Sequence, residues 1–212
     1  MNKTKIDWPW KPLYTINPVV GCKRGCSFCY AHKMNNRFKW IPKWEELQFF
    51  PERLDQFKKL KKSDSCFINS VSDPAYWDLD WISETFGAME YSNCENFLVL
   101  SKDEWAYESC GWPDKCQLGL TLTGLESSIQ DKVEYFFSGA TGSNKVFLSI
   151  EPLLGIVDLG LKPFCPEYVT HVIVGAESGP GATKTKPEWI QSVRDCVPEN
   201  KIYWKSSMRE YL

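Results

Sequence analysis

Short runs of apolar, β-branched and aromatic residues recur along the chain, and each run ends in small or polar residues. Runs of this length and composition predict β-strands. The predicted strands cover residues 13–20, 66–70, 97–100, 118–123, 146–150, 172–174 and 202–204.

Helical spacing of apolar residues appears between several of these runs, over residues 81–91, 127–138 and 187–196. The last of these begins with Pro187, which suits the first turn of a helix. Strands that alternate with helices predict a parallel α/β architecture. The nearly continuous apolar runs NFLVLS and HVIVGA fit strands in a sheet that helices cover on one face.

Polar side chains follow almost every predicted strand. The carboxyl ends of parallel strands lie at the same edge of a sheet or barrel, where binding sites are built. Ordinary strand-to-helix loops and helix caps favour the same residue types, so each position also has a purely structural interpretation. The polar or glycine positions at these ends are Asn69, Ser70, Ser72, Asp73, Ser101, Lys102, Thr121, Thr123, Ser149, Glu151, Gly175, Glu177, Ser178 and Lys205.

The length of 212 residues predicts one domain over residues 1–212. No apolar run reaches the length of a membrane span, and the N-terminus has no secretory signal, so we expect a cytoplasmic protein without a membrane partner. A net charge of −2 gives no general indication of nucleic-acid binding. The basic run 57–62 (FKKLKK) predicts the solvated face of a helix, with phosphate contact as the alternative.

Three of the nine cysteines, Cys22, Cys26 and Cys29, lie within eight positions directly after the first predicted strand. In a reducing compartment, such clustering indicates metal or redox chemistry rather than a disulfide framework. A structural zinc site normally has four protein ligands, and no fourth cysteine lies at matching spacing, although His32 is close. Three thiolates on a four-iron cluster would leave one iron open to a reacting ligand. A zinc knuckle and redox-active thiols are the alternatives.

The C-x3-C-x2-C spacing, with Phe28 before the last cysteine, resembles the signature of radical S-adenosylmethionine (radical SAM) enzymes. The resemblance implies a partial (β/α)6 barrel of the TIM type and a [4Fe–4S] cluster on the three cysteines. It also implies that S-adenosylmethionine binds the open iron and is cleaved to a 5′-deoxyadenosyl radical after an electron arrives from a flavodoxin- or ferredoxin-type donor. Phe28 and Tyr30 would pack beside the cluster and the adenine.

The same resemblance assigns roles to the strand ends. Expected contacts to the cofactor amino group come from Ser70, Ser72 and Asp73, and contacts to its ribose or carboxylate come from Ser149 and Glu151. Glycine at 175 would let the backbone approach the adenine. The remaining cofactor positions are Thr121, Thr123 and Ser178, and the expected catalytic residues are Lys102, Glu177 and Lys205.

A second resemblance covers most of the chain. Asn17-Pro18 and the segments NSVSD, LVLSK, LSIEPLLG and VIVGAESGPG are similar to a short phage- and prophage-associated family of radical-SAM-like proteins. The sequence departs from that family where Thr123 replaces a glutamate and where Ser206 follows Lys205. The phage association implies a nucleobase in DNA as substrate, for example an already modified thymine, and allows for a partner protein that completes the site. The alternatives are a radical SAM enzyme for RNA, a peptide or a small metabolite, and a zinc- or cluster-containing binding module without turnover.

Overall fold

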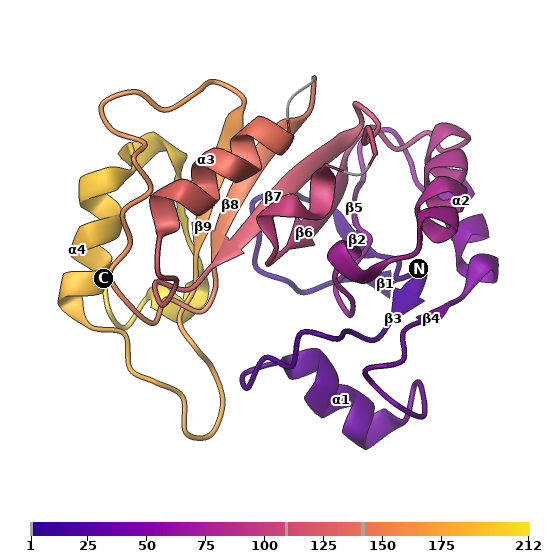
Figure 1. Ribbon diagram of the computed structural model, residues 1–212, viewed down its shortest axis with the longest axis horizontal. Coiled ribbons are helices and arrows are strands. Elements are labelled where there is room, and N and C mark those ends of the chain that lie inside the picture. The colour runs from indigo at the N-terminus through magenta and orange to yellow at the C-terminus, as the bar shows by residue number, and fades with distance from the viewer. Residues whose placement is uncertain (1, 109, 141–142) are drawn as a thin grey trace. The chain divides into compact units, whose positions relative to one another are not determined.

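The computed structural model describes residues 2–108, 110–140 and 143–212 (Figure 1). The chain divides into two compact units. The first unit contains Met1–Ile6 and Trp10–Leu100, and the second contains Asp7–Pro9 and Ser101–Leu212. Three residues near the N-terminus therefore belong to the unit that the C-terminal half of the chain forms.

Four strands of the first unit are neighbours in the order β1 (Asn2–Lys3), β2 (Leu13–Thr15), β5 (Ser65–Phe67) and β6 (Phe97–Ser101). The first pair is antiparallel, with Lys3 opposite Tyr14, whereas β2, β5 and β6 are parallel. A separate antiparallel pair joins β3 (Val19–Val20) to β4 (Gln48–Phe49).

The helices of the first unit are α1 (Tyr30–Phe38), the 3-10 helices η1 (Pro51–Lys59) and η2 (Pro74–Tyr76), and α2 (Leu79–Glu90) (Figure 1). Both 3-10 helices begin with proline, whose fixed φ and missing N–H suit a first helical position. The predicted helix over 81–91 is thus confirmed as α2, which begins two residues earlier.

The second unit has four parallel strands in the order β7 (Cys116–Leu122), β8 (Lys145–Ile150), β9 (Val169–Val174) and β10 (Ile202–Trp204). Its α-helices are α3 (Ile129–Gly139) and α4 (Pro187–Cys196), and its 3-10 helices are η3 (Glu104–Tyr107), η4 (Glu199–Lys201) and η5 (Ser206–Met208). Residues 146–150 of β8 are all buried, as a parallel strand between two neighbours should be.

The predicted α/β class with mostly parallel strands is confirmed. The single strand predicted over 13–20 is wrong. Pairing with β5 ends at Ile16, whose N–H binds the Phe67 carbonyl at 3.2 Å. The chain then passes Asn17 and Pro18, and proline cannot donate to a ladder, so Val19 and Val20 pair with β4 instead.

None of the helices within the described ranges is long and apolar enough to cross a membrane.

The basic run 57–62 has buried apolar residues and exposed lysines. Phe57 and Leu60 are buried and the lysines are exposed, so the predicted solvated face is confirmed, on a 3-10 helix that ends at Lys59.

Candidate functional site: the cysteine loop

The cysteine loop begins where the segment after β3 meets the segment after β5. Gly21 donates its N–H to the Val71 carbonyl at 3.1 Å and forms a parallel bridge with Ser72. Its φ is 109°, and an added Cβ would lie 2.7 Å from the Trp44 carbonyl oxygen. Only glycine fits such a backbone, so the sequence anchors the start of the loop beside the carboxyl end of β5.

The three cysteines are all half-buried free thiols. Cys22 is held by its backbone N–H, which binds the Trp44 carbonyl at 2.9 Å. Cys26 follows Gly25, and its carbonyl accepts the N–H of Cys29 at 3.1 Å. The side chains of Cys22 and Cys29 pack against a buried apolar cluster that consists of Val20, Ala31, Ile41, Trp44 and Val71.

Electrostatics couple the thiols to one another. The pKa of Cys22 is raised to about 12, chiefly by burial. Negative charge on Asp73, Cys26 or Cys29 contributes to this rise, and the N–H of Arg24 opposes it. Three thiolates in this loop would therefore repel one another unless a cation lay between them.

Cys29 is the N-cap of α1, and its Sγ accepts the N–H of His32 at 3.4 Å. The next residue, Tyr30, donates its hydroxyl proton to the Ser70 carbonyl. Ser70 in turn donates to the Asn17 side-chain oxygen at 3.0 Å. Arg53 closes this network, because its guanidinium donates to the Asn17 carbonyl at 2.8 Å. Tyr30, predicted to lie beside an adenine, thus also ties α1 to the end of β5.

Two other residues predicted after β5 have local structural partners. Ser72 accepts the indole N–H of Trp77 at 3.2 Å. Asp73 is buried and caps η2, because its carboxylate accepts the N–H of Ala75 at 3.1 Å. Phe28 is half-buried within the loop.

The donor set suits an iron–sulfur cluster, which thiolates hold in proteins. Gly25 has φ of 70° and open space where a Cβ would be, so the middle of the loop has room to adjust. Within the described residues, however, no three His, Cys, Asp or Glu side chains are already grouped in positions that could hold a metal ion. Binding a cluster would thus require the thiols to turn toward one another.

A second polar group lies in the second unit at the carboxyl ends of β8, β9 and β10. Glu151 forms an ion pair with Lys205 and accepts the Ser149 hydroxyl at 2.9 Å and the indole N–H of Trp8 at 3.2 Å. A Cβ on Gly175 would lie 2.8 Å from the Glu151 carboxylate. Four residues from four parts of the sequence therefore meet around the Glu151 carboxylate.

The remaining predicted positions are distributed over the second unit. Thr121 is buried in β7 opposite Ser149 of β8. Thr123 gives its N–H and hydroxyl to the carboxylate of Glu126, at 2.9 and 3.1 Å. Lys102 is half-buried just after β6.

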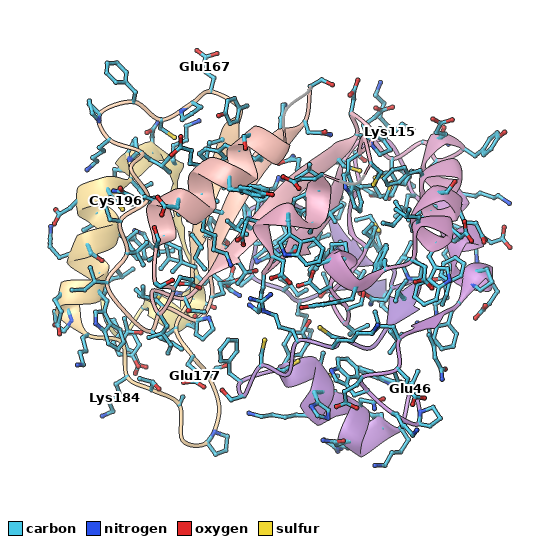
Figure 2. All side chains as sticks on the ribbon, viewed as in Figure 1. Glu46, Lys115, Glu167, Glu177, Lys184 and Cys196 are labelled. Carbon is cyan, nitrogen blue, oxygen red and sulfur yellow. The ribbon has the colours of Figure 1, made fainter. Side chains whose placement is uncertain are left out.

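Glu177 and Ser178 lie on the loop after β9, which also carries Lys184 (Figure 2). The Glu177 carboxylate accepts the N–H of Thr183 at 2.9 Å, and Ser178 is exposed. The predicted catalytic role of Glu177 therefore competes with a hydrogen bond that shapes its own loop.

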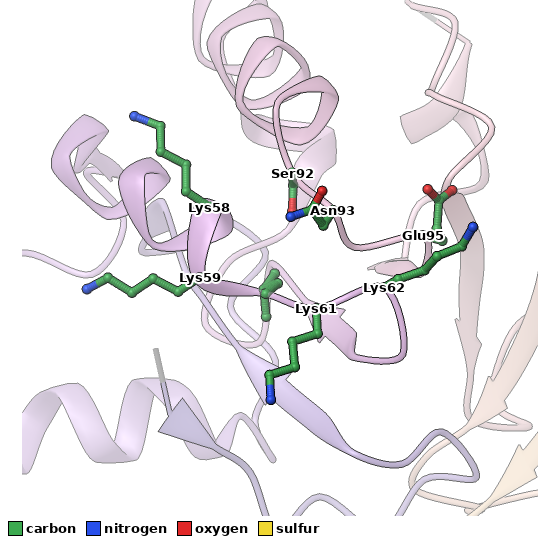
Figure 3. Close-up of a pocket in the computed structure, with 8 residues that line it drawn as sticks. Lys58, Lys59, Lys61, Lys62, Ser92, Asn93 and Glu95 are labelled. Carbon is green, nitrogen blue, oxygen red and sulfur yellow. The ribbon is translucent and has the colours of Figure 1, made fainter.

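Two recesses in the described surface have none of the three cysteines in their lining. One, of about 610 Å³, is bordered by Lys58–Lys62, Ser92, Asn93 and Glu95, and its lysine side chains point in different directions (Figure 3). The other, of about 390 Å³, is bordered by Glu104, Glu126, Ser127, Ser128, Asp131 and Lys132. Neither contains a residue that the sequence predicted for the site.

Sequence reasoning missed the partners that hold these groups, namely Trp8, Arg53 and Glu126. Glu126 had a usable signal, because an acid three residues after Thr123 forms the capping pattern T-x-x-E. Trp8 had none, since it lies 143 positions from Glu151.

Comparison with known proteins identifies the family of the chain. No curated protein and no solved structure matches the chain. One family model, described as a protein of unknown function (DUF5131), matches residues 3–207. The matched range includes the cysteine loop and the whole polar group around Glu151. The chain therefore belongs to the DUF5131 family of proteins of unknown function.

Proposed function

We propose that the protein is a radical SAM enzyme that holds a [4Fe–4S] cluster through Cys22, Cys26 and Cys29 and acts on a base in DNA. The observation that carries the proposal is the cysteine loop itself. Three half-buried free thiols stand on one short loop, anchored by Gly21 at the carboxyl end of β5. Polar groups at this end of parallel strands are where α/β proteins build their sites.

The chain's own residues orient the ligands. The backbone bond from Cys22 to the Trp44 carbonyl holds the backbone of one ligand, and the N-cap position of Cys29 holds the backbone of another. Apolar packing against the Val20 cluster limits water on one side of both. When bound, such a cluster supplies one electron that breaks the bond between the sulfonium sulfur and the 5′ carbon of S-adenosylmethionine.

The polar group of the second unit has chemistry that suits the cofactor. The carboxylate of Glu151 can accept hydrogen bonds from ribose hydroxyls, and the ammonium of Lys205 can pair with a carboxylate. The parallel strands of each unit are also compatible with the partial (β/α)6 barrel that this class of enzyme uses. The proposed electron donor is a flavodoxin- or ferredoxin-type protein.

The first test is anaerobic reconstitution with iron and sulfide. We expect about four irons and four sulfides per chain. Addition of a reductant and S-adenosylmethionine should then give 5′-deoxyadenosine, measured by chromatography. Stoichiometric zinc that is retained through reconstitution, with no cleavage of S-adenosylmethionine, would reject the proposal in favour of a binding module.

Cys26→Ala is the most specific variant, because this cysteine is not among the residues packed on the Val20 cluster. It should abolish iron binding and 5′-deoxyadenosine formation while the unfolding temperature of the metal-free protein stays unchanged. Cys165→Ala is the matched control, since Cys165 is another half-buried free thiol outside the loop. The control should keep both iron binding and 5′-deoxyadenosine formation.

A further inference from the structure

The outer face of α1 exposes large apolar side chains beside the cysteine loop. Tyr30 is 54% exposed, Met34 39% and Phe38 53%, and Trp40, just after the helix, is 37% exposed. Phe38 and Trp40 stack at 6.1 Å between ring centroids, with 13° between their planes. The helix forms one edge of the first unit's fold in Figure 1.

These side chains share one side of the helix with two cations. At 100° per residue, Lys33, Arg37, Tyr30, Met34 and Phe38 span an arc of about 140°. The buried residues of α1, Ala31 and Asn35, lie on the adjoining arc and face the Val20 cluster and the Ile41 backbone. Helix α1 therefore presents to solvent a face that combines apolar and basic residues.

The charge of this region differs from that of the whole chain. Between Asp7 and Glu45 the sequence has no Asp or Glu, although the chain as a whole has a net charge of −2. The basic residues in this interval are Lys11, Lys23, Arg24, Lys33, Arg37, Lys39 and Lys43. Within the described residues, no ion pair joins Lys33, Arg37 or Lys39 to an acidic group.

We propose that this outer face of α1, made of Tyr30, Lys33, Met34, Arg37, Phe38, Lys39 and Trp40 and called here the α1 face, binds single-stranded nucleic acid. Flat aromatic rings offer bases a stacking surface, and cations spaced along the same face neutralise phosphates. The guanidinium of Arg37 lies over the Phe38 ring, 5.1 Å from its centroid, so a cation and an aromatic ring of this face are in contact.

This inference deepens the proposed function, because it names single-stranded nucleic acid as the substrate class. It rests on the proposed function only for the reaction that follows binding. Cys29 is the N-cap of the same helix, so a strand bound along the face would run toward the cysteine loop. An enzyme that acts on a base needs that base in a single strand or turned out of a duplex. Binding itself needs neither cluster nor cofactor.

The test is fluorescence anisotropy with a labelled single-stranded DNA of mixed sequence, without reductant or S-adenosylmethionine, over a range of salt concentrations. The same sequence as RNA and as duplex DNA completes the set. We expect the single strands to bind at least fivefold more tightly than the duplex, and affinity to fall steeply with salt. The DNA and RNA strands together show which backbone the α1 face prefers.

Charge reversal locates the binding surface. Lys33→Glu with Arg37→Glu should weaken single-strand binding at least tenfold and reduce the slope of log K against log salt by about 1.4. Lys58→Glu with Lys59→Glu makes the same charge change on η1, in the other basic region of the same unit, and should change affinity less than twofold. An equal loss in the two double variants would overturn the proposal.

Aromatic truncation separates stacking from charge. Phe38→Ala with Trp40→Ala should weaken single-strand binding at least fivefold and leave the salt slope unchanged. Tyr91→Ala removes a ring that is 83% exposed elsewhere in the first unit and should have no effect. Thermal unfolding of each variant confirms that the fold is retained.

Absence of single-strand binding at low salt, or tighter binding to acidic lipid vesicles than to DNA, would reject the α1 face as a nucleic-acid surface. These outcomes are independent of cofactor cleavage. Single-strand binding without 5′-deoxyadenosine formation would reject the proposed function and support this inference. Formation of 5′-deoxyadenosine without single-strand binding would support the proposed function and reject this inference.

Discussion

Asp7 shows how strongly one side chain near the N-terminus is bound to the end of the chain. Its carboxylate accepts the Tyr203 hydroxyl at 2.8 Å and the N–H of Ser206 at 2.5 Å. Burial by itself would raise the pKa of Asp7, but these hydrogen bonds and the charge of Lys205 together lower it to about 2. The same contact raises the pKa of Tyr203, because burial and the neighbouring carboxylate both disfavour the phenolate.

This lowered pKa predicts a pH-dependent contribution of Asp7 to stability. The folded pKa lies below the ordinary value of 3.8, so the ionised carboxylate stabilises the fold above that pH. The contribution is lost as pH falls through 3.8 toward about 2. Asp7→Asn should therefore lower the urea midpoint by a constant amount above about pH 5, and the difference from the parent should shrink in more acidic solution.

The measurement is urea unfolding of the metal-free proteins, with Asp195→Asn as control. Asp195 is an exposed residue of α4 whose carboxylate accepts a hydrogen bond from the Gln191 side chain. Its removal should shift the midpoint little at any pH. A midpoint difference for Asp7→Asn that stayed constant down to about pH 2 would contradict the assignment.

At the scale of elements, the cysteine loop depends on two glycines with different surroundings. Gly21 has φ of 109° and backbone within 2.7 Å of a new Cβ, whereas Gly25 has φ of 70° and nothing within 4 Å. Both positions disfavour a side chain through φ, but only Gly21 disfavours it through packing as well.

Alanine substitution at these two positions should therefore have unequal effects. Gly25→Ala should cost about 1–2 kcal/mol in the free energy of unfolding, from the left-handed backbone alone. Gly21→Ala should cost a further 1–3 kcal/mol or so, because the Trp44 carbonyl must move. Chemical denaturation measures both values, and equal costs would show that the start of the loop is not anchored as described.

Sequence patterns predict the elements whose own residues determine them. Helix α4 appears at the predicted residues 187–196 because proline begins it and its apolar positions repeat at helical spacing. Helix α1 was missed, because its apolar residues are exposed and its buried polar residue, Asn35, is satisfied by the backbone of Ile41 outside the helix. A pattern of apolar residues does not reveal a helix that is held by a thiol cap and by hydrogen bonds between a polar side chain and the backbone just after the helix.

In the candidate site, too, the sequence predicts the features that depend on local spacing and does not predict the contacts that depend on tertiary structure. Spacing alone identifies the three cysteines as a group, and strand alternation correctly places Phe147, Ser149 and Glu151 on one face, where Trp8 contacts the first and third. The contacts that position these groups are non-local. Ser70 meets an asparagine 53 positions away, and this kind of pairing depends on tertiary structure that one sequence does not display.

On the scale of the whole molecule, Trp8 is the side chain through which the N-terminal segment enters the second unit. It is 2% exposed, its ring lies edge-on to Phe147 at 5.6 Å, and its indole N–H binds Glu151. A buried aromatic of this size contributes several kcal/mol through packing, and the hydrogen bond adds to it.

Replacement of Trp8 should therefore destabilise the second unit, although Trp8 lies far from residues 101–212 in the sequence. Trp8→Ala should lower the free energy of unfolding by about 3–5 kcal/mol. Trp8→Phe should lower it less, because phenylalanine keeps part of the packing although it lacks the indole donor. Hydrogen exchange should show the largest loss of protection in β8, β9 and β10. Loss confined to the amides next to position 8 would show that the segment only lies on the surface.

The contacts of Asp7 and Trp8 with residues far along the chain also determine when the second unit can complete its fold during synthesis. Tyr203, which binds Asp7, is synthesised 196 residues later. The Trp8 indole likewise cannot bind Glu151 until 143 more residues have been added after it. A gene split between the units would give a C-terminal fragment without that indole, and a short peptide carrying Asp7–Pro9 is the piece such a fragment would need to recover.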